Sequence, residues 1–413
     1  MQNRILIIIF FNFIAVSCYS QLPVLSENTM VQKFYEIGQN NLYWFSSNKN
    51  IKRANEWLTA IEFSDNLGLA SNKLQIAQIR SALANKKKND IFYKEQVDKQ
   101  ITAIALNFIK ELQQGSMIFD YDEVSTQNDS AYVYQLLNSK TKEPVSKIIE
   151  LLDCNDRDYM ILKKFLQDSI SENNTLKYKA VIKAMNYRRY IRFNRQSEYI
   201  FVNIPSAEAE YYRNDSLYLK MKTVVGKKSK PTPTISSYIT SIVTFPYWNV
   251  PHSIAVNELL HKVQENDNYL EQHNYEVVDS NSIVIEDSEL NWKDYTPRNF
   301  PYYFRQSTGI NNALGVLKFN LQNPFSIFLH STSNIATFGN DYRFLSHGCI
   351  RLEKPLELAD ALLRGNIDIE ELKNGKAHTK SKTIALSNKI PIFIIYCLAI
   401  VESGNVVFLK DVY

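Results

Sequence analysis

The sequence predicts an α+β protein in which an all-helical N-terminal domain precedes a β-rich domain that carries an inserted lid segment. Residues 22–195 repeat apolar side chains at helical spacing. From residue 199 onward, short β-prone runs alternate with turns. A polar, irregular stretch at residues 251–303 interrupts these strands, which predicts an insertion. The expected boundaries are 1–20 for a signal segment, 21–196 for the helical domain, 197–413 for the β-rich domain, and about 252–305 for the lid.

The first twenty residues have the pattern of a secretory signal. Arg4 supplies a positive start, and residues 5–16 are apolar apart from Asn12. This run is shorter than the roughly 20 residues that a membrane-spanning helix needs. We favour cleavage before Gln21; the alternative is lipidation at Cys18, which would tether the protein to the outer or inner membrane. Both alternatives export the protein.

The helical region shows apolar stripes that indicate core packing rather than a ligand site. One stripe comprises Met30, Val31, Phe34 and Ile37, and another comprises Tyr178, Val181, Ile182 and Met185. We therefore expect an all-helical domain without chemistry of its own.

The β-rich region begins as a meander. The expected strands are 199–204, 209–212, 217–225, 239–245, 316–320, 326–329, and a closing hairpin of 392–401 with 406–410. Pro355 in the first turn of an apolar run predicts a helix over residues 355–363.

The charge balance argues against a nucleic-acid partner. The net charge is only +4 over 413 residues, and the basic runs, such as residues 86–88, are short. Nucleic-acid binders concentrate basic residues on one face, so these runs are expected to be solvated surface.

Cysteine usage draws attention to one thiol. Of the four cysteines, Cys18 lies in the signal, which leaves an odd number in a compartment that oxidises thiols. Cys154 and Cys397 lie in apolar patterns and are expected to be small buried hydrophobes. Cys349 is the exception.

Cys349 lies in the segment Ser346-His347-Gly348-Cys349-Ile350-Arg351. A nucleophilic thiol needs a nearby base or positive charge, and His347 and Arg351, two positions away, project to the same side of an extended chain. Gly348 lets the backbone approach a substrate closely, and the N–H groups of Gly348 and Cys349 are expected to form an oxyanion hole.

A second histidine lies nineteen positions upstream of Cys349. His330 and Ser331 follow the apolar strand of residues 327–329. A histidine at a strand end, beside a cysteine from a neighbouring strand, meets the geometric requirement for a nucleophile and its base, although a lone histidine is often only a hydrogen-bonding group.

The array of His330 and residues 346–351 resembles the signature of the YkuD-type L,D-transpeptidase family, in which a histidine precedes Ser/Thr-His-Gly-Cys and an Arg or Asn. Residues 247–255 and 314–320 are similar to the large periplasmic subgroup of these enzymes. The helical region, through residues 34–35 and 186–190, is similar to that subgroup's scaffold domain. We find no pattern for the separate peptidoglycan-binding module of larger relatives.

The resemblance implies a role for each residue of the motif. Cys349 would be the nucleophile, His330 its general base, and His347 a group that tunes or orients the thiol. Ser331 would orient His330 through its backbone carbonyl, and Arg351 would hold a substrate carboxylate or the local loop. The remaining residues implied are Gly348 for the oxyanion, and Ser346 and Trp248 for the substrate. The alternatives are a buried salt bridge for Arg351 and core packing for Trp248.

The implied reaction remodels peptidoglycan in the periplasm without a metal or an organic cofactor. Cys349 would attack the carbonyl of the L-centre of diaminopimelate in a donor tetrapeptide and release D-Ala. An amine of a neighbouring stem peptide would resolve the thioester as a 3-3 cross-link. Carbapenems would acylate Cys349.

Three alternatives stay open on the sequence. The same site could hydrolyse its thioester, as an L,D-carboxypeptidase or endopeptidase. The protein could instead be a non-catalytic cell-wall-binding protein. A metal site of His330, His347 and Cys349, with Cys397 as a further candidate ligand, is a poor match to zinc, which prefers paired ligands at short spacing.

Overall fold

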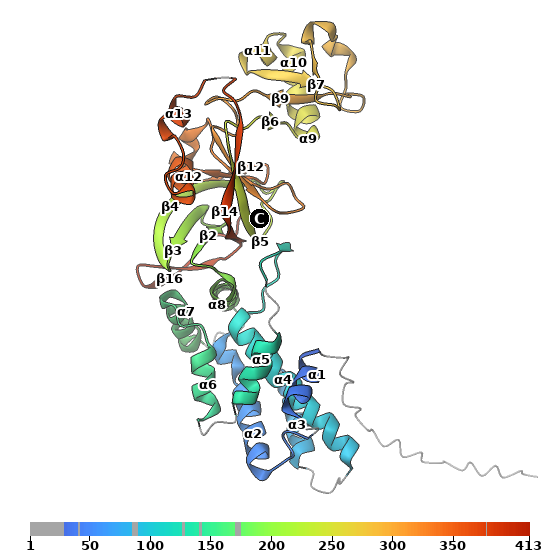
Figure 1. Ribbon diagram of the computed structural model, residues 1–413, viewed down its shortest axis with the longest axis vertical. Coiled ribbons are helices and arrows are strands. Elements are labelled where there is room, and N and C mark those ends of the chain that lie inside the picture. Colours follow the sequence, from blue (N-terminus) through green and yellow to red (C-terminus); the bar gives the residue numbers. More distant parts are fainter. Residues whose placement is uncertain are drawn as a thin grey trace, which may run out of the picture.

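The computed structural model describes residues 29–39, 42–84, 90–125, 129–139, 143–169, 175–376 and 378–413. The signal segment and Cys18 lie outside these ranges. Figure 1 shows three bodies in a row, with helices at one end, a large sheet in the middle and the insert at the other end. No helix in the described ranges is long and apolar enough to cross a membrane.

The N-terminal body is helical, as expected. Its helices are α1 (Thr29–Gly38), α2 (Asn48–Glu62), α3 (Lys73–Ala84), α4 (Ile91–Gln114), α5 (Asp129–Asn138), α6 (Val145–Leu152), α7 (Arg157–Asp168) and α8 (Leu176–Asn194). Several begin at side-chain caps; for example, Thr175 accepts a hydrogen bond from the Tyr178 N–H at the start of α8. Phe34, Trp44 and Trp57 are fully buried in a core formed by α1 to α6.

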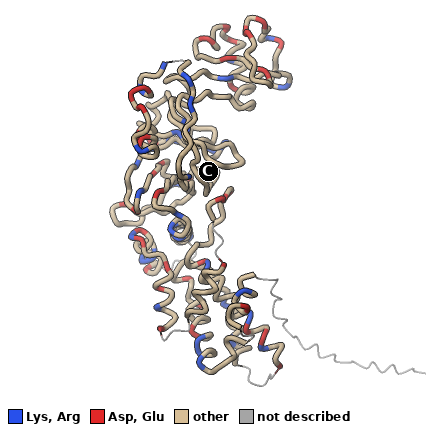
Figure 2. Tube along the Cα trace, in the orientation of Figure 1, with Lys and Arg blue, Asp and Glu red and all other residues tan. Residues whose placement is uncertain are grey.

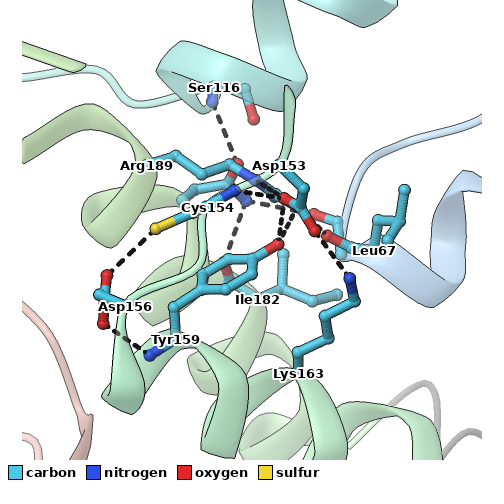
Figure 3. A network of polar contacts seen from close by, with 11 residues as sticks. Leu67, Ser116, Asp153, Cys154, Asp156, Tyr159, Lys163, Ile182 and Arg189 are labelled. Atoms are coloured by element: carbon cyan, nitrogen blue, oxygen red, sulfur yellow. Dashed lines mark hydrogen bonds and ion pairs between the residues drawn. The ribbon is translucent and has the colours of Figure 1, made fainter. Parts of the chain in front are cut away.

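A buried polar network ties α7 and α8 together (Figure 3). Asp153 accepts hydrogen bonds from Tyr159 Oη at 2.6 Å, Lys163 Nζ at 2.8 Å and Arg189 Nη2 at 3.1 Å. Arg189 also donates to the Leu67 carbonyl at 2.8 Å. Because Arg189 is paired with Asp153, its full burial is compatible with a folded interior.

The middle body is one closed sheet. Its strands are β2 (Glu198–Asn203), β3 (Glu208–Arg213), β4 (Ser216–Gly226), β5 (Ile235–Thr244), β10 (Leu317–Leu321), β11 (Leu329–His330), β12 (Phe344–Ser346), β13 (Ile350–Leu352) and β14 (Lys382–Ile395). The order runs β5-β10-β11-β13-β4-β3-β2-β14, and β14 also pairs with β5, so the path returns to its start. Helix α12 (Pro355–Leu363), which has Pro355 in its first turn as predicted, contributes Leu358 and Ala359 to the core of this body.

Three features of the β-rich region differ from the expectation. The predicted strand at residues 326–329 is only the two-residue β11. The predicted closing hairpin is confirmed, since β15 (Ala399–Glu402) pairs with β16 (Asn405–Phe408), but its first strand is shorter than the expected 392–401, because β14 ends at Ile395. In addition, β1 (Tyr121–Asp122), from within the helical region, pairs with β5.

The insert is a folded unit rather than an irregular segment. Its strands β6 (Trp248–Asn249), β7 (Tyr275–Val278), β8 (Val284–Ile285) and β9 (Tyr303–Gln306) form a sheet in the order β6-β9-β7-β8. Its helical pieces are α9 (His252–Ile254), the π-helical turn η3 (Ala255–Leu259), α10 (Leu260–Glu265) and α11 (Tyr269–Gln272). A separate core, including the buried Trp292 and Phe304, holds the insert together.

Basic and acidic residues are interspersed along the trace (Figure 2). Some of these oppositely charged side chains form ion pairs; for example, Arg305 Nη2 lies 2.7 Å from Glu276 Oε2.

Candidate active site

Three neighbouring strands bring the predicted motif residues together. β11 pairs in parallel with β13, which places His330 opposite Arg351. β10 lies on the other side of β11, and Lys318 is opposite His330. Directly paired residues point to the same face of a sheet, so Lys318, His330 and Arg351 form a row across three strands. Cys349 directly precedes β13, and its thiol interacts electrostatically with both Lys318 and Arg351.

The Cys349 thiol is half-buried at the turn that enters β13. Its Sγ lies 3.7 Å from the Ser326 carbonyl oxygen. Burial raises the pKa of the Cys349 thiol to about 11, although the Phe328 backbone N–H, Lys318 and Arg351 each favour the thiolate. In the free protein the group is therefore a thiol at neutral pH.

His330 is buried and its ring orientation is fixed. Its Nδ1 lies 2.5 Å from the Ser331 carbonyl oxygen, which was the expected contact. Because a carbonyl can only accept, we assign the proton to Nδ1, which leaves the lone pair on Nε2 as the basic site. Burial, followed by the nearby Arg351 charge, lowers the pKa of His330 to about 3, so the ring is neutral.

Ser331 has a second function in the fold of this region. Its hydroxyl accepts from the Leu317 N–H at 2.9 Å and donates to the Leu314 carbonyl at 2.9 Å. These bonds join the end of β11 to the start of β10, and so they position His330.

The turn before Cys349 differs from the expectation for Gly348 and Ser346. The Gly348 N–H donates to Ser346 Oγ at 3.2 Å, so in this structure it does not face an incoming carbonyl. Ser346 is 2% exposed, and its hydroxyl also donates to the Cys349 carbonyl at 2.6 Å. Ser346 thus braces the turn and is not available to contact a substrate.

Gly348 is nevertheless required by the backbone. Its φ is +118°, and a Cβ built there would lie 3.0 Å from Ile327 Cδ1. Its carbonyl accepts from Thr232 Oγ1 at 2.7 Å. The turn therefore favours glycine for conformation and close approach.

His347 does not contact the thiol, which corrects the role expected for it. Its Nε2 lies 2.7 Å from Glu258 Oε1, and Lys227 Nζ lies 3.3 Å from the same nitrogen. Glu258 belongs to η3 of the insert. His347 therefore connects the turn before Cys349 to the insert.

Arg351 is half-buried, and its Nε has no hydrogen-bond partner among the described residues. Within the same ranges no ion pair involves Arg351, so the alternative of a buried salt bridge is wrong. The guanidinium group therefore has no carboxylate partner in the described part of the chain.

Trp248 packs in a core, which was the alternative to its expected role in substrate binding. It lies half-buried in β6, and its ring centroid is 6.2 Å from that of Tyr275 in the insert. It packs against the insert core rather than beside Cys349.

The other two thiols differ from Cys349 in exposure. Cys154, Cys349 and Cys397 are all free, but Cys154 and Cys397 are buried at 4% exposure. Burial raises the pKa of Cys397 to about 11, and burial with the nearby Asp156 raises that of Cys154 to about 12. No group of three or more His, Cys, Asp or Glu residues within the described part of the chain could hold a metal ion.

The sequence reasoning missed Lys318. Its ammonium group lies 4.3 Å from the centroid of the Phe328 ring, and it influences the Cys349 thiol electrostatically. A lysine in a short strand carries no local signal of this role, because the strand pairing that creates it is non-local.

Comparison with known proteins assigns two regions of the chain. Residues 197–370 match the model of the L,D-transpeptidase catalytic domain, YkuD, and residues 29–166 match the model named Scaffold domain. A protein of Haemophilus influenzae named "Putative L,D-transpeptidase" is 36% identical over 253 residues, which cover 61% of this chain and 50% of the relative. The chain thus matches about half the length of this curated relative.

Solved L,D-transpeptidase structures are more distant. A mutant of the Enterococcus faecium enzyme is 11% identical, with a TM-score of 0.25 over 49% of this chain and 51% of the other. The Mycobacterium smegmatis enzyme is 14% identical, with a TM-score of 0.22 over 48% of this chain and 58% of the other. The two family matches, and not these structures, carry the assignment: the chain contains a YkuD L,D-transpeptidase catalytic domain at residues 197–370 behind a Scaffold domain at residues 29–166.

Proposed function

We propose that this protein forms 3-3 cross-links between peptidoglycan stem peptides, with Cys349 as the nucleophile and His330 as its base. The observation that carries the proposal is the alignment of His330 with Arg351 across two paired strands, next to the turn that holds Cys349. Cys349 is also more exposed than the other two described thiols. The proposal includes export to the periplasm.

The first half of the proposed reaction forms a thioester. As Sγ of Cys349 attacks the carbonyl of the L-centre of diaminopimelate, its proton passes to Nε2 of His330. The amide bond to the terminal D-Ala breaks, and the same proton leaves with the D-Ala amine. Arg351, which has no carboxylate partner within the described ranges, would hold a substrate carboxylate. The N–H of Cys349 itself would face the developing oxyanion.

The second half resolves the thioester. A side-chain amine of a neighbouring stem peptide attacks the thioester carbonyl and gives a proton to His330, and the Cys349 sulfur leaves. Water in place of the amine would give a trimmed tripeptide, the L,D-carboxypeptidase outcome. Carbapenems, whose ring carbonyl is open to the same attack, would remain bound to Cys349 as acyl adducts.

The test is mass spectrometry of the purified mature protein incubated with disaccharide-tetrapeptide muropeptides. We expect a cross-linked dimer that lacks one D-Ala, absent with Cys349→Ala and retained with Cys397→Ala. Tripeptide monomer alone would identify a hydrolase. No product, together with no carbapenem adduct on Cys349, would indicate a non-catalytic wall-binding protein.

A further inference from the structure

The face that carries Cys349 holds two cations without an acidic partner. Lys318 of β10 and Arg351 of β13 flank His330 of β11 in one row. Both are half-buried, and within the described ranges neither forms an ion pair with a carboxylate. Burying a charge is costly unless it is paired, so the fold retains these two cations at a cost in stability.

The position of Lys318 indicates which group its charge stabilises. Lys318 Nζ is held 4.3 Å from the centroid of the Phe328 ring, a cation–π arrangement that fixes its position over β11. The backbone N–H of Phe328 favours the Cys349 thiolate. Phe328 therefore interacts with the thiol through its backbone and with Lys318 through its ring.

Electrostatics connect both cations to the same group. Burial lowers the pKa of Lys318 and that of Arg351, and the one charge that favours each protonated form is the Cys349 thiolate. His330 faces the same site but is neutral, and His347, on the turn, is bonded to Glu258 and Lys227. No carboxylate in the described part of the chain therefore competes with the thiolate for Lys318 or Arg351.

We propose that Lys318 is a positioning residue that acts through Cys349: its ammonium group is the counter-charge of the Cys349 thiolate, which leaves the Arg351 guanidinium for the substrate carboxylate of the proposed function. The inference rests on Cys349 being the reacting thiol of the proposed function. In this proposal the neutral His330 ring accepts the proton of the Cys349 thiol, but it does not provide the positive charge that stabilises the thiolate.

The ionisation step balances without a further reactant. In the protein without substrate, the S–H bond of Cys349 breaks, the electron pair stays on sulfur, and the proton passes by way of Nε2 of His330 to solvent. With a donor peptide bound, His330 instead passes this proton to the D-Ala amine, as in the proposed function. The negative sulfur then faces two fixed cations. An imidazolium ion in the same place would be repelled by both of them.

The test is the pH profile of Cys349 alkylation by iodoacetamide in the full mature protein, followed by mass spectrometry of the peptide that carries Cys349. Only the thiolate reacts, so the profile reports its pKa. We expect Lys318→Met and Lys318→Gln to move the profile to higher pH and to slow alkylation at neutral pH about tenfold, which corresponds to roughly one pKa unit. Lys318→Arg keeps the charge and should restore the wild-type profile.

Two controls separate the charge effect from damage to the fold. Lys389→Met removes another lysine that lies over an aromatic ring, 5.9 Å from the Tyr238 centroid, on a strand of the same sheet. It should leave the profile unchanged. Cys154 and Cys397 are buried, so their labelling rises only if a variant unfolds.

The inference is overturned if the profiles of Lys318→Met and Lys318→Gln superimpose on that of the wild type while both variants remain folded. It is also overturned if Lys318→Arg behaves as Lys318→Met, because shape rather than charge would then matter. A rise in KM for the tetrapeptide with an unchanged alkylation profile would assign Lys318 to a substrate carboxylate instead. Alkylation needs no muropeptide, so failure of the proposed transpeptidation would leave this test intact.

Discussion

His330 combines deep burial with two neighbouring cations, and this combination has a consequence for stability. The folded protein holds the ring neutral down to a pKa of about 3, whereas the exposed ring of the unfolded chain has its ordinary value near 6.5. Below that value the unfolded chain binds a proton that the folded protein does not. The stability linked to His330 is therefore fully present above about pH 6.5 and is lost as the pH falls toward the folded pKa.

We expect His330 alone to cost the wild type about 2 kcal/mol of unfolding free energy between pH 7 and pH 5. His330→Gln should lose less stability over this interval, because glutamine does not titrate. Urea denaturation at both pH values measures the difference. His261→Gln, at an exposed histidine, is the control and should match the wild type. Equal losses in the wild type and His330→Gln would show that the ring is not held neutral.

Gly348 allows a second prediction at the residue scale. We expect Gly348→Ala to destabilise the fold by about 1–3 kcal/mol, because alanine is strained at φ +118° and its Cβ would press on Ile327. The shifted turn should also slow alkylation of Cys349. Gly404→Ala is the control, since it has φ +81° but open space around the new Cβ. It should lower the thermal unfolding temperature without affecting the thiol. Normal alkylation in Gly348→Ala would mean that this turn does not position Cys349.

The residues found from the sequence were those with a local signal. Cys349 and His330 come from a short motif and a strand end, and the structure brings their strands together. The orientation of side chains was less accessible: Ser346 bonds within the turn, and His347 bonds to Glu258, a residue 89 positions away in the chain. Such contacts depend on tertiary structure, which no local pattern encodes.

Among the elements, β11 is a very short strand that nevertheless positions His330, the proposed base. It has two residues, yet it pairs with β10 on one side and β13 on the other. A strand this short cannot be predicted from alternation, which is why the expected strand over residues 326–329 was too long. The insert was mistaken for an irregular segment for the same reason, since β6 and β8 each have two residues.

The contact between Glu258 and His347 connects the insert to the turn before Cys349, and it predicts how well residues 255–265 are protected from hydrogen exchange. We expect Glu258→Gln to weaken this contact and to raise hydrogen exchange over residues 255–265 by up to roughly fivefold, because one exposed hydrogen bond contributes about 1 kcal/mol. Hydrogen exchange with mass spectrometry measures the effect. Glu265→Gln, an exposed carboxylate at the end of α10, is the matched control. Unchanged exchange in Glu258→Gln would mean that the insert core alone fixes this segment.

At the scale of the whole molecule, the helical and β-rich bodies share a core. The buried Tyr187 and Tyr190 of α8 belong to one cluster with Phe393 and Ile395 of β14. The ring centroids of Tyr190 and Phe393 are 6.0 Å apart. The change of composition near residue 196 thus marks a change of secondary structure, but the packing continues across it. The sequence could not reveal this, because β14 lies about 200 positions after α8.

The shared core predicts that α8 and β14 lose their structure together. We expect Phe393→Ala to cost about 3–5 kcal/mol and to raise hydrogen exchange in both α8 and β14, because the cavity would open between them. Phe304→Ala is the matched control: this phenylalanine is also fully buried, but in the insert core, so the variant should loosen β7 and β9 and leave α8 unchanged. If Phe393→Ala loosened β14 while α8 kept its wild-type protection, the helical body would be stable on its own. In that case the role of the Scaffold domain would have to be sought in binding rather than in supporting the sheet that carries Cys349.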